Sequence, residues 1–277
     1  MFSIRKAHGR RIAASAVIAA GTLGAFAIAD AANATPRADR KPKPTIVLEH
    51  GAFADSSSWN GVIKKLRHDG FPVVAAANPL RSPASDASAL RGVISHVKGP
   101  VILVGHSYGG SVISAAGAKN PQVKALVYVA AFLPEPGESA QDLAGLFPGS
   151  TLPDAVEPVP VTGPDGAEGT DLYIRQDKFH HQFAADVPAG QAALMAAEQR
   201  PITEAALAEK ATVAAWHEKP SWDVIAKQDM NIPVAAQRFM AQRAHAHVTE
   251  VNASHAVAVS HPGVVASAIE QAARATR

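Results

Sequence analysis

A serine flanked by glycines is the first candidate for chemistry in this sequence. Residues 105 to 109 read Gly-His-Ser-Tyr-Gly, which fits the pattern G-x-S-x-G around Ser107. The apolar run VILVG predicts a buried strand, and the run GSVISAAGAK after it predicts a helix. A serine at such a strand-to-helix turn is typically a nucleophile on a strained backbone, and Gly105 and Gly109 supply the space that the turn requires. The pattern therefore predicts a nucleophile elbow at Ser107, with a simple helix-capping serine as the alternative.

A nucleophilic serine of this kind needs an orienting acid and a base, which follow it in the order Ser, Asp or Glu, His. Asp229 lies at the predicted end of the strand SWDVIAK, and His255 follows the last predicted strand, HVTEV. The carboxyl ends of parallel strands open on one edge of a sheet, so these side chains are expected to converge on Ser107. His261 also follows the last strand, but it leads into Pro262 and the final helix. We therefore assign Asp229 as the acid and His255 as the base.

Three other carboxylates are alternatives to Asp229. Asp223 lies in the middle of the same predicted strand, which points its side chain away from the edge of the sheet. Glu135 and Glu138 follow the fourth predicted strand, where an acid could also serve. The geometric argument favours Asp229 over all three.

Acyl transfer also requires backbone N–H groups that stabilise an oxyanion. One such group belongs to the residue after the nucleophile, Tyr108, and another to the loop after the first strand. That loop reads His-Gly-Ala-Phe, so Ala52 or Phe53 is expected to supply the second amide after the tight turn at Gly51. A plain strand-to-helix connector is the alternative interpretation of this loop.

Alternating strand and helix patterns predict how these residues are positioned. Apolar runs at 45–49, 73–77, 101–105, 123–131, 221–227 and 247–251 predict about six strands, with helical patterns between most of them. Strands that are apolar on both faces and alternate with helices predict a mostly parallel sheet covered on both sides, an α/β fold. The segment from about residue 133 to about residue 219 interrupts this alternation of strands and helices. It is rich in proline, glycine and acid early and helical later, and it predicts a helical cap insertion without strands.

The N-terminus has the features of a secretory signal peptide. Residues 1–34 contain the basic stretch RKAHGRR, an apolar run and the cleavage pattern ANA, and residues 35–44 read as a proline-rich linker. We therefore expect an exported protein whose mature domain is 45–277 and which has no stable membrane association. An uncleaved membrane anchor is the alternative, and Arg10–Arg11 leaves the twin-arginine and general export routes open.

Composition narrows the classes of function. The chain has 277 residues, 47% of them hydrophobic and 18% charged, which indicates a globular domain. Residues 1–34 hold four of the 26 basic and one of the 24 acidic residues, so the rest carries a net charge of −1. We find no basic patch for nucleic acid or anionic lipid. There is no cysteine, which excludes a thiol nucleophile and a thiolate metal site, and the sequence indicates neither a cofactor nor a metal.

Taken together, HGAF, GHSYGG, Asp229 and SHAVAVSHP resemble the α/β-hydrolase-fold serine esterases, in the branch of plant methyl esterases and hydroxynitrile lyases. The resemblance covers about residues 45–273. It implies hydrolysis of small carboxylic esters through an acyl-enzyme, without a cofactor, under a helical cap. By position it implies Ser107 as nucleophile, His255 as base and Asp229 as acid.

Two departures from the lyases favour hydrolysis. The lyases carry a lysine after the catalytic histidine and a threonine in the oxyanion loop, where this chain has Ala256 and Gly51. The alternatives are a cofactor-free perhydrolase or haloperoxidase, a lyase on the same site, or a ligand-binding protein without catalysis. The natural substrate and the oligomeric state are not predicted by the sequence.

Overall fold

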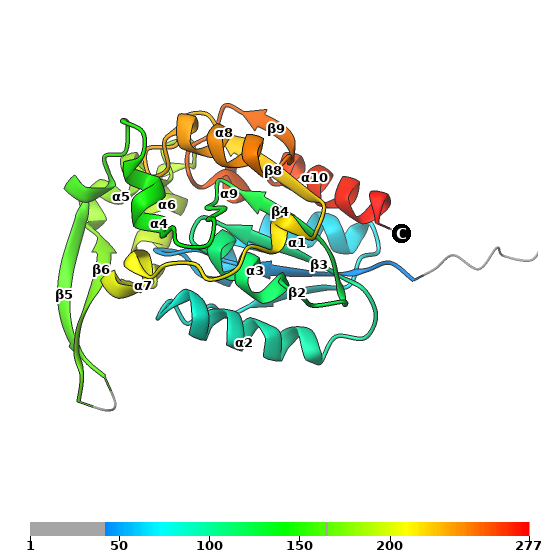
Figure 1. The fold of residues 1–277 in the computed structure, drawn as a ribbon. Helices are drawn as coiled ribbons and strands as arrows, with labels where there is room; N and C mark the ends of the chain where they lie inside the picture. Colours follow the sequence, from blue (N-terminus) through cyan, green and yellow to red (C-terminus); the bar gives the residue numbers. More distant parts are fainter. Residues whose placement is uncertain (1–41, 164–165, 277) are drawn as a thin grey trace, which may run out of the picture. The chain divides into compact units, whose positions relative to one another are not determined.

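Six parallel strands form the central sheet, in the order β2-β1-β3-β4-β8-β9 (Figure 1). The computed structural model describes residues 42–163 and 166–276. These strands are β1 (Thr45–Glu49), β2 (Val73–Ala76), β3 (Val101–His106), β4 (Val123–Val129), β8 (Ser221–Ala226) and β9 (His247–Val251). The predicted α/β architecture with about six strands is confirmed.

Helices cover both faces of this sheet, because its central strands are apolar on both sides. Along β1, Ile46 and Leu48 face one apolar core and Val47 faces the other. The first core includes side chains of α1 (Asn60–His68), α9 (Val257–Ser260) and α10 (Pro262–Ala275). The second includes side chains of α2 (Pro83–Ser95), α3 (Gly109–Gly117) and α8 (Val234–Arg243), together with the cap. The sheet is therefore the rigid middle layer that positions the ends of its strands.

The insertion between β4 and β8 is a cap that contains both helices and strands. Its helices are α4 (Ala140–Gly145), α5 (Gln176–Phe183), α6 (Ala189–Glu198) and α7 (Glu204–Ala208), with short 3-10 turns η2 (Leu152–Asp154) and η3 (Ala215–His217). Its strands β5 (Val156–Thr162), β6 (Glu168–Ile174) and β7 (Ile202–Thr203) form a second, antiparallel sheet in the order β5-β6-β7. Figure 1 shows β5 and β6 as a long hairpin next to the cap helices.

The expectation of a strand-free insertion is therefore wrong, and the reason lies in β5. Its sequence VEPVPVT carries Pro158 and Pro160, which normally argue against a strand. Here β5 is an edge strand of the small sheet, where a missing N–H costs no ladder hydrogen bond. Most of β5 is exposed, so it also lacks the buried apolar face that reveals a strand in a sequence.

The strand before Asp229 also ends earlier than predicted. β8 stops at Ala226, and Asp229 lies in the turn that follows. The structure does not describe residues 1–41, so the predicted signal peptide at 1–34 and the linker up to residue 41 lie outside the described residues. Within residues 42–163 and 166–276, no helix is both long and apolar enough to span a membrane.

Candidate active site

Ser107 occupies a strained turn between the end of β3 and the start of α3. Its φ of 54° lies in the left-handed region, which is costly for a residue with a side chain. A β-carbon at Gly105 would lie 2.6 Å from the carbonyl oxygen of Gly109, and one at Gly109 would lie 2.6 Å from that of Glu49. The turn is closed by a hydrogen bond from the Gly110 N–H to the Ser107 carbonyl oxygen (2.9 Å). The glycines therefore allow the backbone segments around Ser107 to pack in direct contact.

Asp229 and His255 form a buried pair at the same edge of the sheet. Asp229 Oδ2 lies 2.7 Å from His255 Nδ1, and the two side chains are 0% and 1% exposed. Asp229 Oδ1 accepts the backbone N–H groups of Asn231 (2.7 Å) and Ile232 (3.0 Å), and Oδ2 also accepts the Gln237 amide (3.0 Å). Four donors thus fix the orientation of the Asp229 carboxylate, and the carboxylate fixes that of the imidazole.

Two aromatic side chains pack around His255 and connect it to the serine turn. The ring of His106, the residue before Ser107, donates from Nε2 to the His255 carbonyl oxygen (2.9 Å). Burial, followed by the nearby His255, lowers the pKa of His106 well below its ordinary value, so His106 is neutral. The Phe183 ring meets the His255 ring edge-on at 4.9 Å. Ser107 Oγ forms no hydrogen bond with any residue in the described part of the chain, and in resting enzymes such contacts often close only when substrate binds.

Asp223, the alternative acid on β8, does not reach His255. Both of its carboxylate oxygens are buried without a hydrogen-bond partner among the described residues. Burial raises its pKa well above the ordinary value, which favours the neutral acid. A neutral, unpartnered acid in the middle of a strand cannot orient a histidine in a neighbouring loop.

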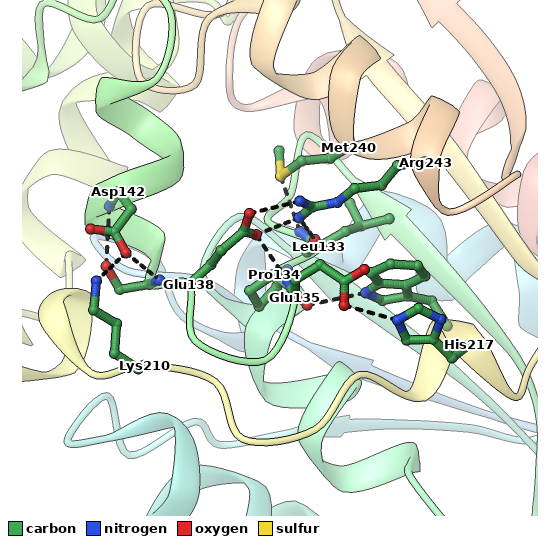
Figure 2. Close-up of polar contacts among 11 residues, drawn as sticks. Leu133, Pro134, Glu135, Glu138, Asp142, Lys210, His217, Met240 and Arg243 are labelled. Carbon is green, nitrogen blue, oxygen red and sulfur yellow. Dashed lines mark hydrogen bonds and ion pairs between the residues drawn. The ribbon is translucent and has the colours of Figure 1, made fainter.

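Glu135 and Glu138 belong to a different set of contacts, at the neck of the cap. We define the neck as residues 131–138, where the chain enters the cap, and 209–217, where it returns. Figure 2 shows Glu135 facing His217 (2.8 Å between Oε2 and Nε2) and Glu138 paired with Arg243 of α8 (2.7 Å from Nη1 to Oε1). These carboxylates therefore hold the neck rather than the candidate base.

The backbone N–H groups expected to stabilise an oxyanion differ in whether they already donate a hydrogen bond. The N–H groups of Tyr108 and Ala52 donate to no acceptor among the described residues. The Phe53 N–H instead donates to the Arg200 carbonyl oxygen of the cap (2.9 Å). The cap therefore already engages the Phe53 N–H, and of the two expected donors only the Ala52 N–H has no acceptor in the described ranges. The loop lies directly against Ser107, since a β-carbon at Gly51 would be 2.6 Å from Ser107 Cβ.

The structure adds a buried acidic cluster behind these amides that sequence patterns did not reveal. The Tyr108 hydroxyl donates to Asp86 Oδ2 (2.8 Å), and burial followed by the Asp86 charge raises the pKa of Tyr108 above its ordinary value. Glu49, the last residue of β1, has one oxygen without a partner among the described residues, and burial and then Asp86 raise its pKa to about 8. No spacing marks these acids in the sequence, because their proximity depends on how α2 packs beside β1 and α3.

A cavity of about 540 Å³ opens beside Ser107, between the sheet and the cap. Its lining is mostly apolar, and Glu204 is the one charged side chain among the described residues that form it. No group of three or more metal-ligating side chains suited to an ion occurs in the described ranges. The lining residues are Ala52, Phe53, Ser107, Tyr108, Phe132, Ala140, Gln141, Ala144, Gly145, Phe147, Pro148, Gly149, Ser150, Leu152, Pro153, Val156, Leu172, Glu204, Leu207, Asn231 and Ile232.

Comparison with known proteins places these features in a family context. A sequence model described as "Alpha/beta hydrolase family" matches residues 46–268. The chain is 27% identical over 252 residues to alpha/beta hydrolase nvfD of Aspergillus novofumigatus, covering 83% of this chain and 97% of that protein. It is 26% identical over 251 residues to a pyrethroid hydrolase of Sphingobium wenxiniae, covering 81% and 85%. In fold it is similar to methylesterase MES16 from Arabidopsis, with a TM-score of 0.69, 18% identity and coverage of 83% and 99%.

Proposed function

Because the chain belongs to the alpha/beta hydrolase family and is a hydrolase, we propose that it cleaves small, uncharged carboxylic esters through an acyl-enzyme on Ser107. The observation that carries this proposal is the buried 2.7 Å contact between Asp229 and His255 beside the strained serine turn. Such a carboxylate holds the imidazole in the tautomer whose other nitrogen can accept a proton from the serine hydroxyl.

The reaction has two steps with the same machinery. His255 removes the proton from Ser107 as Oγ attacks the ester carbonyl carbon, and the resulting imidazolium protonates the alcohol oxygen as the C–O bond breaks. Water then attacks the acyl-enzyme, gives its proton to His255, and the acid leaves as Ser107 regains a proton. Asp229 stays ionised and stabilises the imidazolium in both steps.

The oxyanion of each step is stabilised by backbone amides. The Tyr108 and Ala52 N–H groups have no acceptor in the described part of the chain, which leaves them available for this role. Donors of this kind contribute about 3–4 kcal/mol each to the transition state. Their geometry depends on Gly51, where the space next to Ser107 admits no side chain. This argues against the threonine-containing loop of the lyases, as does Ala256 after the histidine.

The cavity supports an uncharged substrate. Its lining is mostly apolar, and none of the described residues that form it is cationic, so a substrate carboxylate would lose its water without gaining a partner. Glu204 would repel such a substrate further. The name of the Sphingobium relative indicates that a pyrethroid is its substrate, which is in line with a pocket for apolar molecules.

The test is the Ser107→Ala variant, with Ser111→Ala as the matched control. Ser111 is a second buried serine, one turn further along α3, whose hydroxyl has no partner among the described residues. Hydrolysis of p-nitrophenyl acetate and labelling by a fluorophosphonate probe should be abolished in Ser107→Ala and retained in Ser111→Ala, with the same circular dichroism spectrum. Ester turnover that survives in Ser107→Ala would contradict the proposal.

The alternative functions are tested by separate assays. Cyanohydrin cleavage would indicate a lyase, and peroxide-dependent halogenation would indicate a perhydrolase. A folded protein that the fluorophosphonate probe never labels would be a binding protein.

We also propose that the enzyme is exported and processed after Ala34. The support is the order of basic, apolar and small residues in 1–34. Expression of the full chain in a secreting host, followed by intact mass measurement of the protein outside the cytoplasm, tests this. A mass that includes residues 1–34 on a membrane-bound protein would overturn it.

A further inference from the structure

A second cavity of about 360 Å³ lies on the other side of the oxyanion loop. It is formed where α6 of the cap faces the loop and helix that follow β1. Part of its described lining is apolar, and the rest carries hydroxyl, amide and carboxylate groups but no cationic side chain. Its polar lining includes Asp55, Ser57 and Asn60 after β1, and Gln191 and Glu198 of α6.

Phe53 is the one described residue that lines both cavities. It is 3% exposed, so it fills the space between them. Its backbone has a φ of 58°, a costly conformation for an aromatic residue, and its N–H is tied to the Arg200 carbonyl oxygen at 2.9 Å. Strain of this kind persists only where the surroundings fix the residue, so Phe53 is held in place as a wall.

The two cavities differ in chemistry in a way that matches the two halves of an ester. The first contains Ser107 and is largely apolar, and the acyl group stays bound to Ser107 after the first step of the proposed reaction. The second offers oxygen acceptors to a hydroxyl donor, together with the apolar surface of Ala54, Met195 and Val259. A released alcohol is a neutral hydrogen-bond donor with an apolar remainder, so it fits these walls better than an anion would.

We propose that the second cavity binds the alcohol half of the substrate and that Phe53 limits the size of that half. This inference rests on the proposed ester hydrolysis. In this arrangement the ester carbonyl lies at the oxyanion loop, the acyl chain extends into the first cavity, and the alcohol points toward Phe53. Small alcohols fit on the Ser107 side of the ring, whereas bulky ones reach the second cavity only when the ring is displaced.

The experiment compares kcat/KM in two ester series that each vary one half. The acyl series runs from p-nitrophenyl acetate to p-nitrophenyl octanoate, and the alcohol series runs from methyl acetate to 1-naphthylmethyl acetate. Phe53→Ala opens a connection between the two cavities, and Met195→Trp fills the second cavity from the half-buried cap side. Phe147→Ala is the matched aromatic control, because Phe147 lines only the first cavity.

Phe53→Ala should raise the naphthylmethyl-to-methyl ratio about tenfold, and Met195→Trp should lower it about tenfold. Phe147→Ala should change the octanoate-to-acetate ratio and leave the alcohol ratio within about twofold. The inference is overturned if Phe53→Ala changes the acyl ratio instead, or if Met195→Trp leaves the alcohol ratio unchanged. Met195→Trp carries the test alone if Phe53→Ala does not fold. Both outcomes require wild-type turnover that depends on Ser107, so failure of the proposed function is seen separately, in the Ser107→Ala assay.

Discussion

The edge of the main sheet and the cap above it are stabilised by different kinds of contact. At the sheet edge, backbone segments touch where glycine allows it: a β-carbon at Gly110 would lie 2.3 Å from the Phe132 carbonyl oxygen. The Asp229 and His255 side chains are almost fully buried there, and hydrogen bonds and ring packing hold both of them. Geometry of this kind leaves almost no conformational freedom to the Asp229 and His255 side chains.

Besides the apolar core that the cap shares with α2, α3 and α8, charged side chains attach the cap at its margins. Arg243 of α8 pairs with Glu138 and donates to the Leu133 carbonyl oxygen (2.8 Å) at the neck (Figure 2). On another side, Arg81 pairs with Asp171 of β6 at 2.7 Å. These side chains are partly exposed, so each contact is weaker than a buried one. Substitutions at the edge should therefore act on the rate of the chemical step, and substitutions in the cap on substrate fit.

Removal of the acid at the sheet edge is the most severe test of this contrast. Asp229→Asn should lower kcat for p-nitrophenyl acetate about 10⁴-fold, because an amide no longer holds His255 in the tautomer that accepts the serine proton. KM should change little, since Asp229 faces the imidazole and backbone amides, away from the cavity. Stopped-flow and steady-state kinetics on the folded variant measure both constants.

Asp223→Asn is the matched control, since Asp223 is also buried and lies on the strand that leads to Asp229. Burial raises the pKa of Asp223 well above its ordinary value and so favours its neutral form. Replacement by a neutral amide should therefore leave kcat within about twofold, because no charge at the site is lost. A loss in Asp223→Asn as large as that in Asp229→Asn would mean that Asp229 is the wrong acid for the orienting role.

The second prediction concerns stability at the edge. The pKa of Glu49 is raised to about 8 by burial and then by Asp86, against 4.5 in the unfolded chain. Between these values the folded protein binds a proton that the unfolded chain has lost, so stability falls as pH rises through this window and levels off above it. Glu49→Gln removes this dependence. Its free energy of unfolding should therefore gain on wild type by about 1.4 kcal/mol per pH unit within the window.

Urea unfolding of both proteins at a series of pH values checks this slope. The two denaturation midpoints should move apart as pH rises from about 5 to about 8 and stay parallel beyond it. Midpoints that keep a constant separation would mean that Glu49 is ionised in the folded protein. That result would leave the sheet edge without the buried neutral acid that the structure indicates.

The parts of the site that the sequence predicts are those set by local rules. The spacing of Gly105, Ser107 and Gly109 follows from sterics within one turn, and the positions of Asp229 and His255 follow from the parallel order of the strands. Both the steric requirement for glycine and the order of the strands can be predicted from the sequence. Asp229 lies beyond the end of β8, yet its side chain caps the next turn through the N–H groups of Asn231 and Ile232, so its place is still locally encoded.

The parts that the sequence did not predict depend on contacts between distant segments. The Phe53 amide is bound by Arg200, far along the chain and within the cap. Pro158 and Pro160 argue against a strand in the sequence, and the sheet accommodates them only because β5 is an edge strand. Glu49 and Asp86 meet only when α2 packs on the sheet. Periodicity and motifs do not contain this information, because each contact is fixed by packing rather than by local order.

The smallest expected effect is at the neck of the cap, where a substitution should change KM and leave kcat nearly unchanged. Arg243→Met removes the ion pair with Glu138, the hydrogen bond to the Leu133 carbonyl oxygen and the contacts of the guanidinium over the Trp216 and Phe239 rings, and it keeps an apolar side chain at this position. KM for p-nitrophenyl butyrate should rise about fivefold, equivalent to about 1 kcal/mol, with kcat changed by less than about twofold. The reason is that the cap positions substrate but contributes none of the proposed reacting groups. Steady-state kinetics over a full range of substrate concentrations resolve the two constants.

Arg238→Met is the control for this substitution. Arg238 lies on the same helix and pairs with Glu250 at 2.7 Å, away from the neck, so both constants should stay at wild-type values. A kcat that falls in Arg243→Met with KM unchanged would mean that the neck controls the sheet edge itself. The division between an edge that sets the rate and a cap that sets the fit would then no longer hold.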